Sequence, residues 1–337
     1  GNPLILIVPE QGSYEAEHAL VNAGGIRGMM RAQVLSFRRL AYRVMQETGG
    51  AAKVAISEEG KRMLMYKILR RRKEELQLFG ASGEQLGFVG KLSELYTEMK
   101  RYCIDASCVE EQLSQMMSGS GNSPMLRRKL EDIVTVFRDF ELEISRLYTD
   151  EEDTLASLAE GVADSEYIKR ADIWIDGFHG FTPQEYRVLG ELIHHANHVT
   201  IALTLDKPYM AGALPHELDL FHPTAVTYIK LKGIADELGI DAEHRMLHPE
   251  VPPRFQDSPV LAHLERGYDR KRRWTGTHGD RNHEGKENGR REGLLLHAAS
   301  HRRAEIEGAL REMLRLAQEE GARFREMAVF VRNMGDY

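Results

Sequence analysis

Residues 171–178 read ADIWIDGF, in which a short, mainly apolar run at 171–176 ends in an acid and is followed by a glycine. Apolar runs of this length that stop abruptly at polar residues are typical of buried strands in parallel sheets. Two more runs have the same form: residues 4–8 read LILIV, and residues 198–204 read HVTIALT before Asp206. A helical pattern occupies residues 183–195, between the run that ends at Asp176 and the run that begins at His198. The sequence therefore predicts an α/β fold built on a parallel sheet.

The first 56 residues alternate the same two patterns. The run at 4–8 is followed by a helical pattern at 14–21, and a second short strand is predicted at 31–37. A second helix is predicted at 39–45 and stops at Gly49 and the glycine after it. Strand and helix alternating at this spacing place helices on the faces of the sheet.

Only helical patterns occur from residue 57 to about residue 158. Ser57 is placed to cap a helix whose first turn contains Glu58 and Glu59. The clearest helix begins at Ser123, followed by proline at its preferred first helical position. Its apolar residues recur at steps of four and three and form one stripe. They are Leu126, Leu130, Ile133, Phe137, Phe140, Ile144 and Leu147. We interpret this helix as the core of a small bundle rather than as a coiled-coil partner site.

The C-terminal part changes character twice. After a predicted helix at 223–238, residues 266–292 contain almost no aliphatic side chains, which indicates a linker or mobile loop. We interpret its Lys and Arg run as solvated rather than as a phosphate contact. A strand at 294–297, a helix at 303–318 and a strand at 327–331 are then predicted to begin a new α/β unit. Because a lone terminal strand cannot bury its faces, we expect both ends of the chain to be cut.

Composition limits the class of protein. The 337 residues are 42% hydrophobic, enough for a large core, and the net charge of −7 argues against general coating of nucleic acid. No apolar run approaches the ~20 residues that span a bilayer. Cys103 and Cys108 are expected to be reduced thiols of a cytoplasmic protein, because a lone C-x4-C pair is too small a metal-ligand set.

The residues that would hydrolyse a nucleotide are missing from this sequence. Asp176, at the end of a strand between two others, stands where a nucleotide-hydrolysing sheet places its magnesium-binding aspartate. The phosphate loop G-x4-G-K-[ST] is absent, and the residue after Asp176 is Gly177 rather than the acid that positions water. The fourteen histidines are scattered without a catalytic or metal-ligand spacing. No complete catalytic site is expected in this segment.

Several segments together resemble the N-terminal part of the AddB family, the second subunits of bacterial AddAB helicase-nucleases. They are residues 4–11, 26–44, 100–103 (KRYC), 175–186 and 297–307. The resemblance covers the whole chain in order, and the set is specific although each segment alone is weak. The wider resemblance is to UvrD-like superfamily 1 helicases. Asp176-Gly177-Phe178 stands at their D-E-F (Walker B) motif, residues 36–41 are similar to T-F-x-x-L-A, and residues 206–208 lack the glutamine of G-D-x-x-Q.

The resemblance implies a fold of the P-loop-NTPase (RecA-like) type: a parallel sheet flanked by helices, an all-helical insertion, and part of a second α/β domain. The implied divisions are 1–56 and 166–255 for domain 1A, 57–165 for the insertion, 256–293 for a flexible linker, and 294–337 for a truncated domain 2A. The resemblance also implies that the parent protein uses ATP, magnesium and an iron-sulfur cluster outside this segment.

The resemblance further implies that this region reads the Chi sequence in single-stranded DNA during double-strand-break repair, beside an AddA-like helicase-nuclease partner. Reading single strands requires aromatic faces for stacking and amides or guanidiniums for base edges. The family's reading positions fall here on Gln11, Ser13, Phe37, Arg39, Tyr42 and Phe178. Ser13 replaces an expected threonine and Tyr42 an expected tryptophan, which leaves the Chi sequence read in doubt.

Three alternatives remain open. Phe37 and Phe178 are also explained by simple core packing, and Arg39 by a charge on a helix surface. The whole region is also explained by a scaffold that holds the partner without reading a sequence. A third hypothesis is an active ATPase in the full-length protein, completed by an upstream phosphate loop.

Overall fold

The computed structural model describes residues 1–23, 31–49, 54–83, 85–117, 123–149, 153–210, 213, 215–247, 253–256, 258–268 and 294–337. The chain forms two compact units, residues 1–243 and residues 244–337. None of the described helices is long and apolar enough to cross a membrane.

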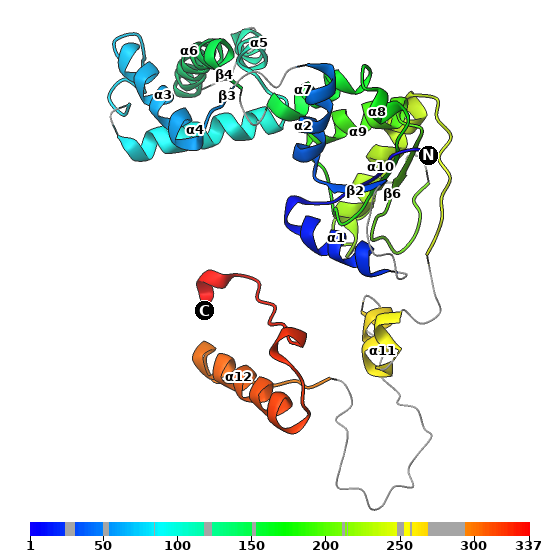
Figure 1. The fold of residues 1–337 in the computed structure, drawn as a ribbon. Helices are drawn as coiled ribbons and strands as arrows, with labels where there is room; N and C mark the ends of the chain where they lie inside the picture. The colour runs from blue at the N-terminus through cyan, green and yellow to red at the C-terminus, as the bar shows by residue number, and fades with distance from the viewer. Residues whose placement is uncertain are drawn as a thin grey trace, which may run out of the picture. The chain divides into compact units, whose positions relative to one another are not determined.

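The first unit contains a four-stranded parallel sheet with helices beside it (Figure 1). Its strands are β1 (Leu4–Ile7), β2 (Ala32–Leu35), β5 (Asp172–Ile175) and β6 (His198–Ile201), in the order β2-β1-β5-β6. All three pairings are parallel, with Leu4 opposite both Ala32 and Asp172. The predicted α/β fold with a parallel sheet is confirmed.

One face of this sheet carries the main core. Ile5, Ile7, Ile173 and Ile175 are at most 1% exposed, because side chains alternate between the two faces of a strand. They pack against α2 (Phe37–Thr48), α7 (Asp153–Val162) and α9 (Pro183–His195), which contribute Leu40, Val44, Leu158, Val162, Val188 and Leu192. Residues 153–162, which we placed in the helical insertion from the sequence, thus belong to the core of the sheet.

The opposite face of the sheet is much more open. Leu4, Leu6 and Trp174 point to this face and line a recess together with Leu20 of α1 (Ser13–Asn22). Trp174 remains 39% exposed. Parallel sheets are usually covered on both faces. In this sheet, the described residues cover the second face only in part.

The helical part of the first unit has a core of its own. It comprises α3 (Glu58–Arg71), α4 (Leu86–Arg101), α5 (Ala106–Met117) and α6 (Pro124–Leu147). Its buried residues include Met65, Ile68, Leu69, Val89, Tyr96, Phe137 and Phe140. The prediction of helices alone was incomplete, because β4 (Tyr148–Thr149) lies within the predicted range and pairs in parallel with β3 (Val54–Ala55). Such two-residue strands carry too little apolar pattern to be found in a sequence.

The stripe predicted on α6 is buried along only part of its length. Ile133, Phe137, Phe140 and Ile144 are at most 4% exposed, whereas Leu126 is 44% exposed. Leu130 packs at the edge of the core, and the side chain of Leu147 lies outside the described residues. The predicted core helix is therefore confirmed for its central turns.

Two more helices complete the first unit. α8 (Glu166–Lys169) precedes β5, and α10 (His222–Glu237) packs against α9. Leu231 of α10 joins the core of the sheet. The predicted helices 183–195 and 223–238 are confirmed, the first with both of its ends as predicted.

The second unit corrects two predictions. It contains α11 (Pro259–Gly267) and α12 (Arg302–Glu319), and the helix predicted at 303–318 is confirmed. Residues 294–297 and 327–331 are not strands, and no residue described from 244 onward lies in one. An apolar run becomes a strand only when a second strand satisfies its backbone groups, and the described part of this unit supplies none. The linker predicted at 266–292 lies mostly outside the described residues.

Candidate nucleic-acid interface

The order of the strands creates a switch point between β1 and β5. From β1 the chain passes to β2 on one side, whereas β5 lies on the other side of β1 and continues to β6. Loops that leave such neighbouring strands diverge, and ligands of open α/β sheets bind in the crevice beyond their carboxyl ends. The Val8 amide donates to the Leu35 carbonyl at 3.0 Å, and the Asp176 amide donates to the Ile7 carbonyl at 3.0 Å. These bonds hold the three strand ends together.

Gln11 and Ser13 follow β1 at this edge. Gln11 lies in the short 3-10 turn Glu10–Gly12 and is exposed. Ser13 begins α1, is only 6% exposed, and its hydroxyl lies 3.5 Å from the Pro9 carbonyl oxygen. Gln11 is therefore accessible to a ligand, whereas Ser13 faces its own backbone.

The start of α2 places Phe37, Arg39 and Tyr42. Ser36 caps the helix, because its hydroxyl accepts from the Arg39 amide at 3.3 Å. Phe37 was predicted to end a strand, but it is the first residue of α2 and is 5% exposed. Arg39 and Tyr42 point outward; Tyr42 is 42% exposed, and the Arg38 guanidinium lies 5.9 Å from the centre of its ring.

One ion pair joins the start of α2 to the 3-10 turn after β1. The Arg39 Nε lies 3.9 Å from Oε1 of Glu10, and both side chains are more than half exposed. Such an exposed pair contributes ~0–1 kcal/mol to stability, so it positions Arg39 more than it stabilises the fold. It brings Arg39 beside the turn that carries Gln11.

Phe178 follows β5 in a loop with a constrained start. Gly177 has a φ of +82°, and a Cβ atom there would lie 3.2 Å from Cδ of Pro9. The preceding Asp176 is exposed, and its Oδ1 accepts from the Gly177 amide at 2.8 Å. The glycine thus allows the loop to turn sharply against the loop after β1.

Three phenylalanines gather behind this edge. The Phe37 and Phe178 ring centres are 5.6 Å apart, those of Phe178 and Phe181 are 5.0 Å apart, and those of Phe37 and Phe181 are 6.3 Å apart. Phe178 is half-buried, whereas Phe37 lies within the core. Phe37 is thus a support behind Phe178 and presents no free face for stacking with a base.

The structure leaves Gln11, Arg39 and Tyr42 exposed and Phe178 half-buried on the segments that follow β1, β2 and β5, and it buries Ser13 and Phe37. Sequence reasoning missed the supporting residues Phe181 and Glu10. The FHGF spacing of 178–181 was an available signal for an aromatic pair. The partnership of Glu10 with Arg39 had no local signal, because it depends on the strand order.

A magnesium site does not fit the described residues. Asp176 is followed by a glycine, and no described group of three or more His, Cys, Asp or Glu is arranged to hold a metal ion.

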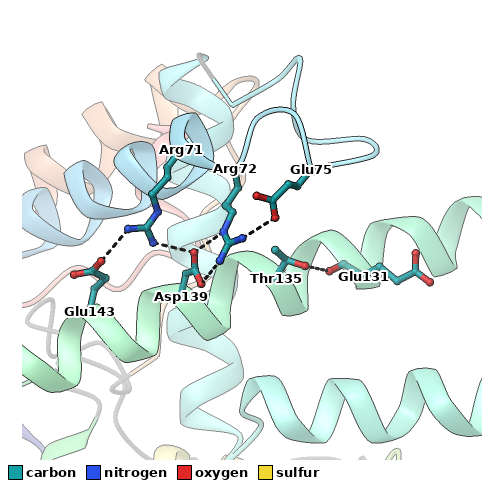
Figure 2. Close-up of polar contacts among 7 residues, drawn as sticks. All are labelled: Arg71, Arg72, Glu75, Glu131, Thr135, Asp139 and Glu143. Carbon is teal, nitrogen blue, oxygen red and sulfur yellow. Dashed lines mark hydrogen bonds and ion pairs between the residues drawn. The ribbon is translucent and has the colours of Figure 1, made fainter.

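A second polar cluster, in the helical part, has a structural role (Figure 2). Arg72 donates to both carboxylate oxygens of Asp139 on α6, at 2.8 and 3.1 Å, and Arg71 donates to Oδ2 of Asp139 at 2.9 Å. Arg71 also reaches Glu143 at 3.0 Å, and Arg72 reaches Glu75 at 2.6 Å. The hydrogen bonds from Arg72 and Arg71 hold the pKa of the Asp139 carboxyl below its usual range. These arginines fasten α3 to α6.

The fold and its exposed strand ends define an α/β protein of the open parallel-sheet class, with a ligand-accessible edge at the switch point. A family model described as "ADDB, N-terminal" matches residues 1–265. Over its whole length the chain is 42% identical to an ATP-dependent helicase/deoxyribonuclease subunit of Desulforudis audaxviator, and 40% identical to that of Anoxybacillus flavithermus. The chain spans 28% of the length of each of these relatives. The chain belongs to the AddB family, and its matched region is the N-terminal one.

Proposed function

We propose that this region binds single-stranded DNA and takes part in reading the Chi sequence, within a helicase-exonuclease that resects double-strand breaks in the cytoplasm. The relatives are named as subunits of an ATP-dependent helicase/deoxyribonuclease, which supports the place in such an enzyme and implies a partner. An AddA-like helicase-nuclease is the partner we propose.

The observation that carries the proposal is the set of accessible side chains at the switch-point edge. Gln11 and Arg39 present an amide and a guanidinium, which pair with base edges through two hydrogen bonds. Tyr42 and Phe178 present partly exposed rings, on which bases stack. Single-strand recognition combines these two chemistries, and the four side chains come from the turn after β1, the first turns of α2 and the loop after β5, which follow neighbouring strands.

The test uses the full-length protein with its partner. We expect Phe178→Ala and Arg39→Ala each to weaken the Chi response while the unwinding rate stays unchanged. Loss of one stacked base costs ~1–3 kcal/mol, which is about a 5- to 150-fold weaker recognition. The matched control is Arg62→Ala, an exposed arginine on α3. An unchanged Chi response in both edge variants would overturn the assignment.

A second candidate, a scaffold that holds the partner, is favoured by a different observation. The open face of the sheet exposes Leu4, Leu6 and Trp174 around an apolar recess, and apolar surface of this kind suits protein contact. In that case a Chi-containing oligonucleotide and a scrambled one bind equally well. Trp174→Ser then weakens association with the partner, and the edge variants leave it intact.

A further inference from the structure

The loop that carries Phe178 is fixed at both ends and in the middle. It begins at Gly177, with its positive φ of +82°, and ends at Thr182. Thr182 and Glu185 form a capping box at the start of α9: the Thr182 amide donates to Glu185 Oε2 at 2.7 Å, and the Glu185 amide donates to Thr182 Oγ1 at 3.3 Å. The middle of the loop is held from another helix.

That middle contact comes from Thr227 on α10. The Thr227 hydroxyl lies 3.3 Å from the His179 carbonyl oxygen, and the residue is only 2% exposed. It also lies 3.0 Å from the Pro223 carbonyl oxygen of its own helix, so one hydroxyl serves two acceptors. A Cβ atom built on Gly180 would lie 3.4 Å from Thr227 Oγ1, which shows how closely the loop approaches α10.

A row of aromatic rings links Phe178 to the same helix. The ring centres of Phe178 and Phe181 are 5.0 Å apart, and those of Phe181 and Tyr186 are 5.6 Å apart. Lys230 Nζ of α10 lies 5.2 Å from the centre of the Tyr186 ring. Burial raises the pKa of Tyr186, and hydrogen bonding to Thr227 opposes this rise. Helix α10 therefore contacts the loop backbone through Thr227 and the ring row through Lys230.

Holding the loop in one conformation has a consequence for recognition. A ring that is already ordered loses less conformational freedom when a base stacks on it than a ring on a loose loop does. A looser loop weakens binding that depends on one base lying exactly over the Phe178 ring. Contacts between the protein and DNA phosphates elsewhere do not depend on the position of this ring. A change at Thr227 should therefore reduce sequence discrimination more than overall affinity.

We propose that Thr227 is a positioning residue for strand reading, which holds the 177–182 loop so that Phe178 is preset to stack on one base of single-stranded DNA. This inference rests on the function proposed above. Because Thr227 is only 2% exposed, it acts through the His179 carbonyl.

The experiment compares Thr227→Val, which removes the hydroxyl at nearly constant volume, with Thr227→Ser, which keeps the hydroxyl. Both are made in the full-length protein with its partner. We expect Thr227→Val to lower the preference for Chi-containing over scrambled oligonucleotide about fivefold or more, with affinity for oligo(dT) unchanged. Thr227→Ser should retain the wild-type preference within about twofold. Thr224→Val, at another buried threonine of α10, is the matched control and should leave the preference unchanged.

Hydrogen exchange of the amides at 178–181 provides a readout that does not depend on Chi. We expect faster exchange in Thr227→Val and wild-type exchange in Thr227→Ser. Unchanged exchange in Thr227→Val overturns the inference, even where Chi reading itself is found. Equal losses of preference in the Val and Ser variants also overturn it, because they indicate packing rather than the hydroxyl. A wild-type protein that does not prefer Chi overturns the proposed function, and the exchange result then decides the positioning role alone.

Discussion

The helical part and the edge of the sheet both contain arginines and acids, but they use them differently. In the helical part, Asp139 is 9% exposed and accepts from Arg71 and Arg72. At the sheet edge, Arg39 meets Glu10 at only 3.9 Å, with both side chains more than half exposed. Charge alone thus does not indicate a binding site. A guanidinium with short bonds to a buried carboxylate supports the fold, and one held loosely at a strand end is available to a ligand.

The largest expected effect is on stability, and it differs between Phe37 and Phe178 in the sheet region. Phe37→Ala empties a core position that is 5% exposed, so we expect a loss of ~3–5 kcal/mol in the free energy of unfolding. Phe178→Ala should cost less, because the ring is already partly exposed. Urea denaturation of both variants measures the difference. Equal destabilisation would mean that Phe178 is a core residue and that the edge lacks a stacking platform.

The next effect tests whether the helical part is purely structural. Asp132 is 2% exposed, and its carboxylate accepts from the amides of residues 77, 78 and 79 at 2.7 to 2.9 Å. Asp132→Ala leaves these donors without their acceptor and should cost about 3 kcal/mol of stability. Calorimetry measures this loss, and DNA binding well below the melting temperature should remain as in the wild type. Weaker DNA binding by the folded variant would assign a binding role to the helical part.

A smaller effect concerns pH. The pKa of Asp139 is lowered in the folded protein, so its contribution is present above the unfolded pKa of ~3.9 and is lost as pH falls through the lower folded value. Asp139→Asn should cost about 1–2 kcal/mol at pH 7, since solvent screens the half-exposed Arg71. The difference in the free energy of unfolding between the wild type and Asp139→Asn should become smaller in strong acid. Urea titrations across pH check this, and a constant gap would contradict the ionic role.

The smallest effect is a gain of stability at the end of α4. Cys103 has a φ of +57°, and the Ile104 amide donates to the Met99 carbonyl at 2.9 Å, as in helix ends that prefer glycine. Cys103→Gly should stabilise the helical part by up to ~1 kcal/mol, because glycine adopts this conformation without strain. A rise in melting temperature with unchanged DNA binding is the expected result, whereas a fall would show that the thiol packs usefully.

The sheet region was predictable from its sequence where local signals agree. The ends of the four strands lie no more than three residues from their predicted positions, because each apolar run is bounded by proline, glycine or polar residues. Helix α9 was predicted at both ends, since Thr182 caps it and Pro183 occupies the first turn.

Predictions failed where the outcome depends on distant residues. The runs at 294–297 and 327–331 have the composition of strands, but no described residue of their unit pairs with them. The burial of Phe37 depends on α2 beginning one residue after Ser36 and on the packing of Phe178 and Phe181. The hydrogen bonds from the amides of residues 77–79 to Asp132 join positions more than 50 apart in the sequence, and no periodic pattern of residues indicates them.

Gly177 has a consequence for the changes of sequence that this loop accepts. A single base change in the gene can turn a glycine codon into an acidic one. The backbone does not accept it: a φ of +82° is strained for any L side chain by roughly 1–2 kcal/mol, and the new Cβ would press against Pro9 at 3.2 Å. An acidic residue after Asp176 therefore requires the loops after β1 and β5 to be rebuilt together.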